Sequence, residues 1–241
     1  MSAIFNKEIR SFFSNAAGYI VVGIFLIMNG LFLWIIPGEF NIPENGYANV
    51  DGLFYLAPWF FMFLCPAITM RFIAEEKHAG TWELLLTKPI SKWKIVTGKY
   101  FAGLFLVILA LLPTIIYYFS VSYLAEPEGN IDSGAFWGSF LGLMFLAAVF
   151  TSIGVFASSL TQNQIISFIV AITISFFMFY GFELITGFAT SGVQIGFLES
   201  MGIHYHYKSI SRGVIDSNDL IYFGVLSFIF LYLTEWRIRK K

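Results

Sequence analysis

The stretch RFIAEEKHAGTWELLLTKPISKWKIVTGKY, from Arg71 to Tyr100, decides how this chain is organised. It holds six of the fourteen Lys and Arg residues of the sequence, and long apolar runs flank it on both sides. A polar island between two apolar runs is typical of a segment at a membrane surface, where a soluble partner can reach it. We therefore expect the rest of the chain to form a membrane-embedded frame around residues 71–100.

The composition excludes an ordinary soluble domain. Of the 241 residues, 58% are hydrophobic and 12% are charged, whereas soluble domains carry about a quarter charged residues. A soluble chain of this length could not bury so many Phe, Ile and Leu side chains in one core. The formal net charge of −1 offers no general attraction for nucleic acid. We expect an all-α polytopic membrane protein, with the lone Cys65 as a small buried hydrophobe.

Six apolar runs are long enough to cross a bilayer, since about twenty helical residues span roughly 30 Å. Chain order places them at approximately 17–36, 53–70, 101–124, 136–160, 164–185 and 220–236. Prolines 58, 66 and 113 fall inside the second and third runs, where we expect kinks. Residues 186–219 form the longest segment between spans. The prediction is a single transmembrane domain over residues 1–241.

Residues 2–14 are amphipathic and predict a short helix in the membrane interface. The apolar positions with helical spacing are Phe5, Ile9, Phe12 and Phe13, and Lys7, Glu8 and Arg10 lie between them. The next apolar run is too long for a signal peptide, and no small-residue cleavage site follows it.

Small residues mark the fourth span as a helix-packing element. Gly138 and Gly142 form a Gly-x-x-x-Gly pair, and Gly154 and Ser158 continue the series. Such residues let helix backbones approach closely. Only residues 161–163 separate this span from the fifth, which predicts a tight helical hairpin.

The distribution of basic residues predicts the orientation. Six alternating spans put twelve Lys and Arg residues on one side, at residues 7–10, 71–100 and the C-terminus, and only Lys208 and Arg212 on the other. The positive-inside rule then places both termini and residues 71–100 in the cytoplasm.

The punctuation of residues 71–100 predicts a short helix inside it. Gly80 interrupts the helix that continues the second span, Thr81 can cap a new helix over residues 82–87, and Pro89 ends it. Ser91 can cap the helix that leads into the third span. On the short helix, the spacing puts three apolar side chains on one face and an acid in the first turn; these are Trp82, Leu85, Leu86 and Glu83.

Two interpretations of this short helix stay open. A helix of about six residues is marginal alone in water and needs a partner surface, so its apolar face suits a groove of a soluble domain. Alternatively, it is an interfacial turn with Trp82 in the aromatic belt and its lysines near anionic lipid.

A family resemblance bears on this choice. The run from Glu75 to Ile90, with its acidic pair, Gly-Thr and Leu-rich turn ending in Pro, resembles the signature after the second helix of ABC transporter type-2 permeases. Residues 154–164 resemble that family's turn between helices four and five, and residues 211–216 its segment before the last helix. Within the family, the chain is most similar to the permease subunit of the gliding-motility transporter of Bacteroidetes.

The resemblance implies the permease subunit of an exporter in the bacterial inner membrane, linked to gliding motility. A separate cytoplasmic ATPase would bind ATP and Mg²⁺ and dock on a coupling helix, and a second permease subunit, of a different kind, would complete the transporter. The positions carried over to the coupling region are Glu75, Glu76, Gly80, Thr81, Trp82, Glu83, Leu85, Leu86 and Pro89. The acidic ones would contact the ATPase or basic residues of neighbouring helices.

Other functions are disfavoured by the residues themselves. Gly98-Lys99 lacks the remainder of a phosphate-binding loop, so we expect no ATP site in this chain. The absence of a polar cluster at membrane depth disfavours an enzyme. His204-x-His206 has the wrong helical spacing for a shared metal, and we expect no metal site. Almost no ionisable residue lies within the spans, apart from Glu183 near one boundary, which argues against proton or sodium coupling.

One alternative from a different class stays open. The chain could be a membrane anchor that transmits ATPase motion to a cell-envelope assembly without moving a substrate. Aliphatic and aromatic helices suit both a lipid-like pathway and a plain scaffold, so the sequence does not separate the two.

Overall fold

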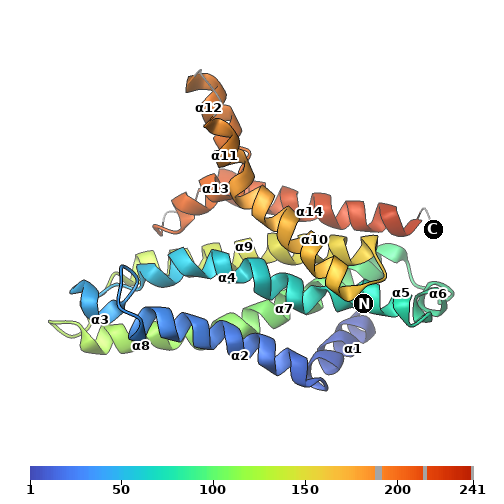
Figure 1. Ribbon diagram of the computed structural model, residues 1–241, viewed down its shortest axis with the longest axis horizontal. Helices are drawn as coiled ribbons and strands as arrows, with labels where there is room; N and C mark the ends of the chain where they lie inside the picture. The colour runs from blue at the N-terminus through green and yellow to red at the C-terminus, as the bar shows by residue number, and fades with distance from the viewer. Residues whose placement is uncertain (188–191, 214–215, 240–241) are drawn as a thin grey trace.

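The computed structural model describes residues 1–187, 192–213 and 216–239, and these residues form helices joined by short turns. Figure 1 shows long helices running side by side, with both chain ends and α6 at one end of the molecule and α3 at the other. We refer to these as the α6 end and the α3 end. Of the residues used to predict the orientation, Lys240 and Lys241 lie outside the described residues.

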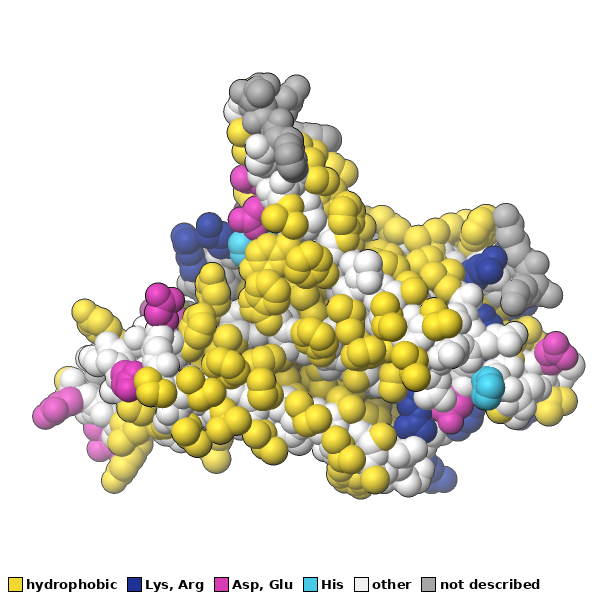
Figure 2. Space-filling model, in the orientation of Figure 1, with side chains coloured by type: hydrophobic (Ala, Val, Ile, Leu, Met, Phe, Trp, Pro, Cys, Tyr) yellow, Lys and Arg dark blue, Asp and Glu magenta, His cyan; other side chains and the backbone are white. Residues whose placement is uncertain are grey.

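Within the described residues, six helices have the length and hydropathy of membrane spans, as predicted. They cover Ala16–Ile35, Asp51–His78, Lys92–Leu124, Ser133–Leu160, Gln164–Thr186 and Ser217–Arg239. The apolar residues of their outer faces are exposed in the isolated chain, and Figure 2 shows them as an extended yellow surface. In a bilayer this surface faces lipid, so the chain is a multi-pass membrane protein.

The second and third spans depart from their predicted limits. The second continues beyond residue 70, because only Met70 separates α4 (Asp51–Thr69) from α5 (Arg71–His78). The third begins at Lys92, with α7 (Lys92–Leu111), and Pro113 lies in a single 3-10 turn before α8 (Ile115–Leu124). Because α5 and the start of α7 carry charged residues, hydropathy alone predicts the end of the second span and the beginning of the third too close to the membrane centre.

Two other spans contain π-helical turns. The first consists of α2 (Ala16–Gly30) and η1 (Leu31–Ile35), and the fifth of α10 (Gln164–Phe176), η3 (Phe177–Gly181) and α11 (Phe182–Thr186). Helix α10 crosses the bundle obliquely, and α11 and α12 (Gly192–Glu199) project from it (Figure 1).

Helix α9 (Ser133–Leu160) is the centre of the bundle and packs against α4, α7, α10 and α14 (Ser217–Arg239). Its small residues make this possible. A Cβ atom on Gly154 would lie 2.0 Å from Thr69 Oγ1 of α4, which no real contact allows, so a larger residue would force the two helices apart.

The Gly138–Gly142 pair contacts the segment before the last span, whereas a Gly-x-x-x-Gly pair suggests contact with another membrane span. A Cβ on Gly142 would lie 2.3 Å from Ile210 Cγ2 of α13 (Ile203–Ile210), and one on Gly138 would lie 2.7 Å from Gly213 O. The pair therefore seats the segment between the last two spans, rather than another membrane span. Tyr207 of α13 also donates a hydrogen bond to Phe54 O of α4, at 2.7 Å.

Candidate functional site

Helix α6 (Thr81–Leu86) is positioned by the turn that precedes it. Gly80 has φ +68°, in the left-handed region that favours glycine, and it is the N-cap residue of α6. The prediction that Thr81 caps the helix is wrong, because Thr81 is its first helical residue and its hydroxyl donates to Glu76 O at 3.3 Å. That bond ties α6 to α5. Ser91 does cap α7, as predicted, accepting from Lys94 N.

The apolar face of α6 is turned toward the chain's own core. Trp82 is only 6% exposed, and Leu85 and Leu86 are half-buried against the main hydrophobic cluster. The opposite face is exposed: Glu83 is exposed and Leu84 is 66% exposed. The apolar face that we expected to meet a soluble partner therefore anchors α6, and the outward residues are the ones available to a partner.

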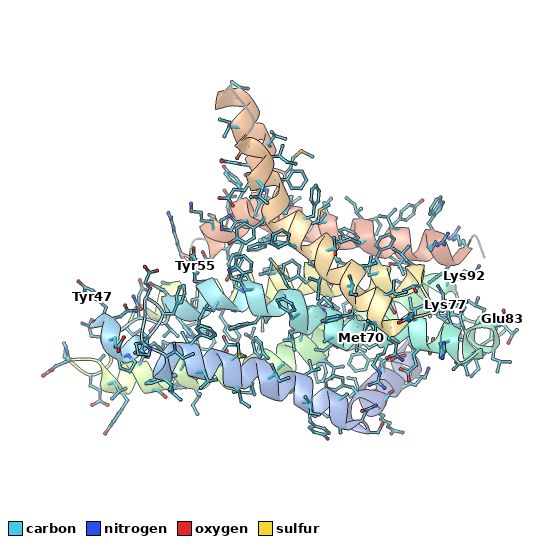
Figure 3. The ribbon with its side chains drawn as sticks, viewed as in Figure 1. Tyr47, Tyr55, Met70, Lys77, Glu83 and Lys92 are labelled. Atoms are coloured by element: carbon cyan, nitrogen blue, oxygen red, sulfur yellow. The ribbon has the colours of Figure 1, made fainter. Side chains whose placement is uncertain are left out.

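The exposed strip continues past the end of α6. Thr87, Lys88 and Pro89 are all exposed, and Figure 3 places Glu83 at the extreme tip of the α6 end. The strip thus combines one acid and one leucine on a short, anchored helix with one base in the turn that follows it. A surface of this kind offers both a hydrophobic contact and charge pairing to a soluble domain.

An ion cluster beneath α6 joins three helices. Lys99 of α7 is completely buried, and its Nζ lies 2.6 Å from Glu8 Oε1 of α1 (Ser2–Phe13) and 3.0 Å from Glu76 Oε2 of α5. It also donates to Phe72 O at 2.5 Å. Lys7 pairs with Glu76 from the more exposed side. Two lysines, one buried and one half-exposed, thus face two buried glutamates, so the charges of the cluster are balanced.

The N-terminal helix α1 packs against the bundle and does not lie only in the membrane interface. Ile4 and Glu8 point inward and are buried, while Phe13 is exposed. Helix α1 therefore packs on α7 through a face that contains a carboxylate, and Gly98 gives it room, since a Cβ there would lie 3.3 Å from Ile4.

Lys7 shows the electrostatic effect of the cluster outside the spans. Partial burial lowers its pKa, but the hydrogen bond and charge of Glu76, together with Glu8 and Glu75, outweigh that effect and raise the pKa above its usual value of 10.5. The ammonium form is therefore favoured in the folded protein.

The three predicted acidic positions have different surroundings. Glu76 is buried in the cluster, Glu75 pairs with Arg71 one turn earlier at 3.0 Å, and Glu83 is exposed. Among the ion pairs of the described residues, none involves Glu83. Of the three, Glu83 is the one best placed to meet another chain.

The end of α9 joins this site from the fourth span. Ser158 Oγ donates to Met70 O and accepts from Ile73 N and Ala74 N, each at 3.0 Å. These three backbone groups lie at the break between α4 and α5 and in the first turn of α5. One turn later in α5, Lys77 Nζ donates to Ser159 O of α9. The break that redirects the chain toward α6 is thus bonded to the central helix of the bundle.

Comparison with known protein families gives the class of the chain. The family described as ABC-2 family transporter protein matches residues 2–218. The chain belongs to this family. No curated protein sequence matches it. Members of the ABC-2 family are membrane permeases that work with an ABC ATPase, so membership sets α6 and its surroundings in the context of a transporter.

The sequence interpretation of this ABC-2 family protein offered basic residues of neighbouring helices as one of two partners for Glu76, but it did not identify Lys99 or include Glu8. Lys7, Glu8 and Lys99 were each assigned to a membrane surface, and the Lys7–Glu76 and Glu8–Lys99 pairs join residues 69 and 91 positions apart. One signal was present. Lys99 follows two turns after Ser91 in a helix whose next residues are apolar, and a lysine in such a position needs a partner.

The two histidines of α13 point to different neighbours. His204 Nδ1 lies 2.9 Å from Glu183 Oε2, whereas His206 Nδ1 lies 2.7 Å from Asp219 Oδ1 and its Nε2 lies 2.8 Å from Ser200 O. Within the described ranges, no three His, Cys, Asp or Glu side chains form a group that could hold a metal ion. Of residues 211–216, which resemble the family's segment before the last helix, residues 214 and 215 lie outside the described residues.

Proposed function

We propose that this chain is the permease subunit of an ABC exporter in the bacterial inner membrane, and that a separate cytoplasmic ATPase docks on α6. The observation that carries the proposal is the two-faced character of α6. Trp82 anchors the helix in the permease, while Glu83 and Leu84 are presented outward at the tip of the molecule. A helix held in this way can transmit force from a docked domain to the frame.

The distribution of charge supports this orientation. The basic residues of α1, of α5 through the start of α7, and of the last turn of α14 all belong to the α6 end. Of the basic residues that the structure describes, only Lys208 and Arg212 lie toward the other end. By the positive-inside rule, the α6 end with both termini is cytoplasmic and the α3 end is external.

The ion cluster supports a mechanical path from α6 to the spans. A push on α6 reaches α5 through the Thr81–Glu76 bond, then α7 and α1 through Lys99, and α9 through Ser158. Because Lys99, Glu76 and Ser158 are buried and bonded to neighbouring helices, α1, α5, α7 and α9 move as one body near the cytoplasmic surface.

The biological process and the other subunits that we propose follow from the family resemblance. We propose that the transporter acts in gliding motility, that ATP and Mg²⁺ are bound by the ATPase, and that a second, different permease subunit completes the complex. Purification of the intact complex from native membranes, with identification of its subunits, tests these points. Recovery of two copies of this chain with no second permease would overturn the heteromer.

Leu84→Asp tests the docking surface. Because Leu84 is 66% exposed, the substitution leaves the permease folded and inserted but puts a carboxylate beside Glu83 in the interface. We expect the co-purified ATPase to fall at least about tenfold, as for loss of a central interface contact worth about 1.4 kcal/mol or more.

The matched control is Tyr47→Asp, which alters an exposed side chain (78%) at the opposite end. It should leave recovery of the ATPase unchanged. If the Leu84→Asp protein retains its ATPase as well as the Tyr47→Asp protein does, docking through the outward face of α6 is wrong.

A further inference from the structure

A cavity of about 660 Å³ opens at the end of the bundle away from α6. It lies between the start of α4, the end of the fifth span (η3 and α11) and α13. In Figure 2, basic, histidine and acidic side chains gather at the base of the projecting α11–α12 arm, beside the apolar surface. The cavity therefore borders both an aqueous and a lipid-facing region.

Two cations line this cavity. Lys208 and Arg212 are both exposed and are separated by one helical turn. They are the basic residues that the positive-inside count leaves on the external side. In the described part of the chain, no carboxylate forms an ion pair with either of them. An ammonium and a guanidinium placed together form a site for a phosphate group.

Two carboxylates line the same cavity, from α4 and α11. Glu183 is held by His204 at 2.9 Å, whereas Asp51 at the start of α4 is exposed and has no ion-pair partner among the described residues. The cavity is thus close to neutral as a whole. A ligand that carries only negative charge would meet repulsion from Asp51, and a ligand with an additional cationic group would not.

The remaining wall is aromatic. Trp59 stacks on Tyr180 with centroids 4.8 Å apart, and Tyr180 stacks on His204 at 5.0 Å. Tyr55 and Trp59 keep 63% and 37% of their surface exposed, and they lie in the first turns of the second span. This wall continues from the charged groups toward the hydrocarbon layer, so it suits a ligand with a polar head and an apolar tail.

We propose that this cavity binds a zwitterionic phospholipid of the external leaflet, one whose headgroup carries a phosphate and a primary amine. Lys208 and Arg212 bind the phosphate, Asp51 receives the amine, and Tyr55 and Trp59 contact the beginning of the acyl chains. The site requires no ATPase, so it can be tested on the chain alone. The assignment of its leaflet rests on the proposed orientation, but binding itself does not.

The experiment is native mass spectrometry of the purified full chain, titrated separately with phosphatidylethanolamine, phosphatidylglycerol and free phosphoethanolamine. We expect the wild-type chain to bind phosphatidylethanolamine in preference to the other two. The double variant Lys208→Gln/Arg212→Gln should bind it at least about tenfold more weakly, since two charge-assisted hydrogen bonds to phosphate are lost. Asp51→Asn should reduce the preference over phosphatidylglycerol.

The matched control is Arg10→Gln/Lys94→Gln, which removes two exposed cations from the α6 end and should bind like the wild type. Equal binding by the Lys208/Arg212 variant and this control would overturn the proposal. Equal binding of free phosphoethanolamine and the lipid would overturn the assignment to a lipid. If thermal unfolding shows that the double variant is destabilised, the single variant Lys208→Gln takes its place and is expected to weaken binding in the same direction.

Discussion

Removing the ammonium of Lys99 should destabilise the protein more than any other single change in the ion cluster. The Lys99 side chain is fully buried, and its Nζ lies within 3.0 Å of both Glu8 and Glu76. In Lys99→Met the shape is nearly kept, but two buried carboxylates lose their shared partner. Breaking a buried ion pair in this way costs about 3–5 kcal/mol.

The neighbouring lysine provides the comparison. The Lys7 side chain is 57% exposed, so solvent screens its pairing with Glu76, and Lys7→Met should cost at most about 1 kcal/mol. The triple variant Glu8→Leu/Glu76→Leu/Lys99→Met removes all the buried charge together. Its stability should recover most of the loss, because replacing a whole buried cluster by apolar side chains is often neutral.

Thermal and denaturant unfolding of the purified chain in detergent measures these differences. Protease accessibility of α1 gives a second readout, since Glu8 is the contact by which Lys99 holds that helix. If Lys99→Met and Lys7→Met lower stability equally, or if the triple variant is as unstable as Lys99→Met, the cluster does not hold the helices together as argued.

Three further predictions concern single positions. Gly154→Ala should lower the midpoint of thermal unfolding by several degrees, because its Cβ would collide with α4, whereas Gly224→Ala, where nothing lies within 4 Å, should not; equal midpoints would contradict the close approach. Gly80→Ala should cost about 1 kcal/mol at its positive φ, measured by denaturant unfolding, and Gly80→Asn less. The pKa of Lys7 is raised in the folded state, so the contribution of Lys7 to stability is complete below pH about 10.5 and is lost as the pH rises through the pKa of the folded protein. The unfolding midpoint should therefore fall more between pH 9 and 12 for the wild type than for Lys7→Met. Parallel curves for the two proteins would refute this contribution.

The layout of the spans could be predicted because each apolar run carries its own evidence. Length and hydropathy are local properties, and turn residues such as Gly80 and Ser91 act within their own segments. The bounds of α6 were therefore close to those observed. Asp216, directly before α14, acts in the same local way and accepts a hydrogen bond from Asn218 N at 3.0 Å.

The direction of the α6 apolar face could not be predicted in the same way. Helical spacing places Trp82, Leu85 and Leu86 together, but the same stripe serves equally well against the chain's own core or against a partner. Only the packing of α5 and α6 decides between these, and it depends on contacts with other spans. The Gly-x-x-x-Gly pair was ambiguous for the same reason, since a small residue indicates close approach without identifying the neighbour.

Only part of the ion cluster could be predicted. Lys99 lies in an apolar helix and needs a partner, and the family resemblance offered basic residues of neighbouring helices as one of two partners for Glu76. Lys7 and Glu8, however, suit an interfacial helix. Their roles come from pairing with Glu76 and Lys99 on other helices, and the sequence does not identify pairs that lie 69 and 91 residues apart.

That separation also bears on how the protein is made. Glu8 is synthesised long before Lys99, so α1 has no partner for its carboxylate while the first two spans enter the membrane. During this time an amphipathic helix stays in the interface, where water solvates the charge. Only when the third span has been inserted can α1 leave that surface and dock. Helix α1 is therefore expected to be translated before the first three spans and to reach its final place after them.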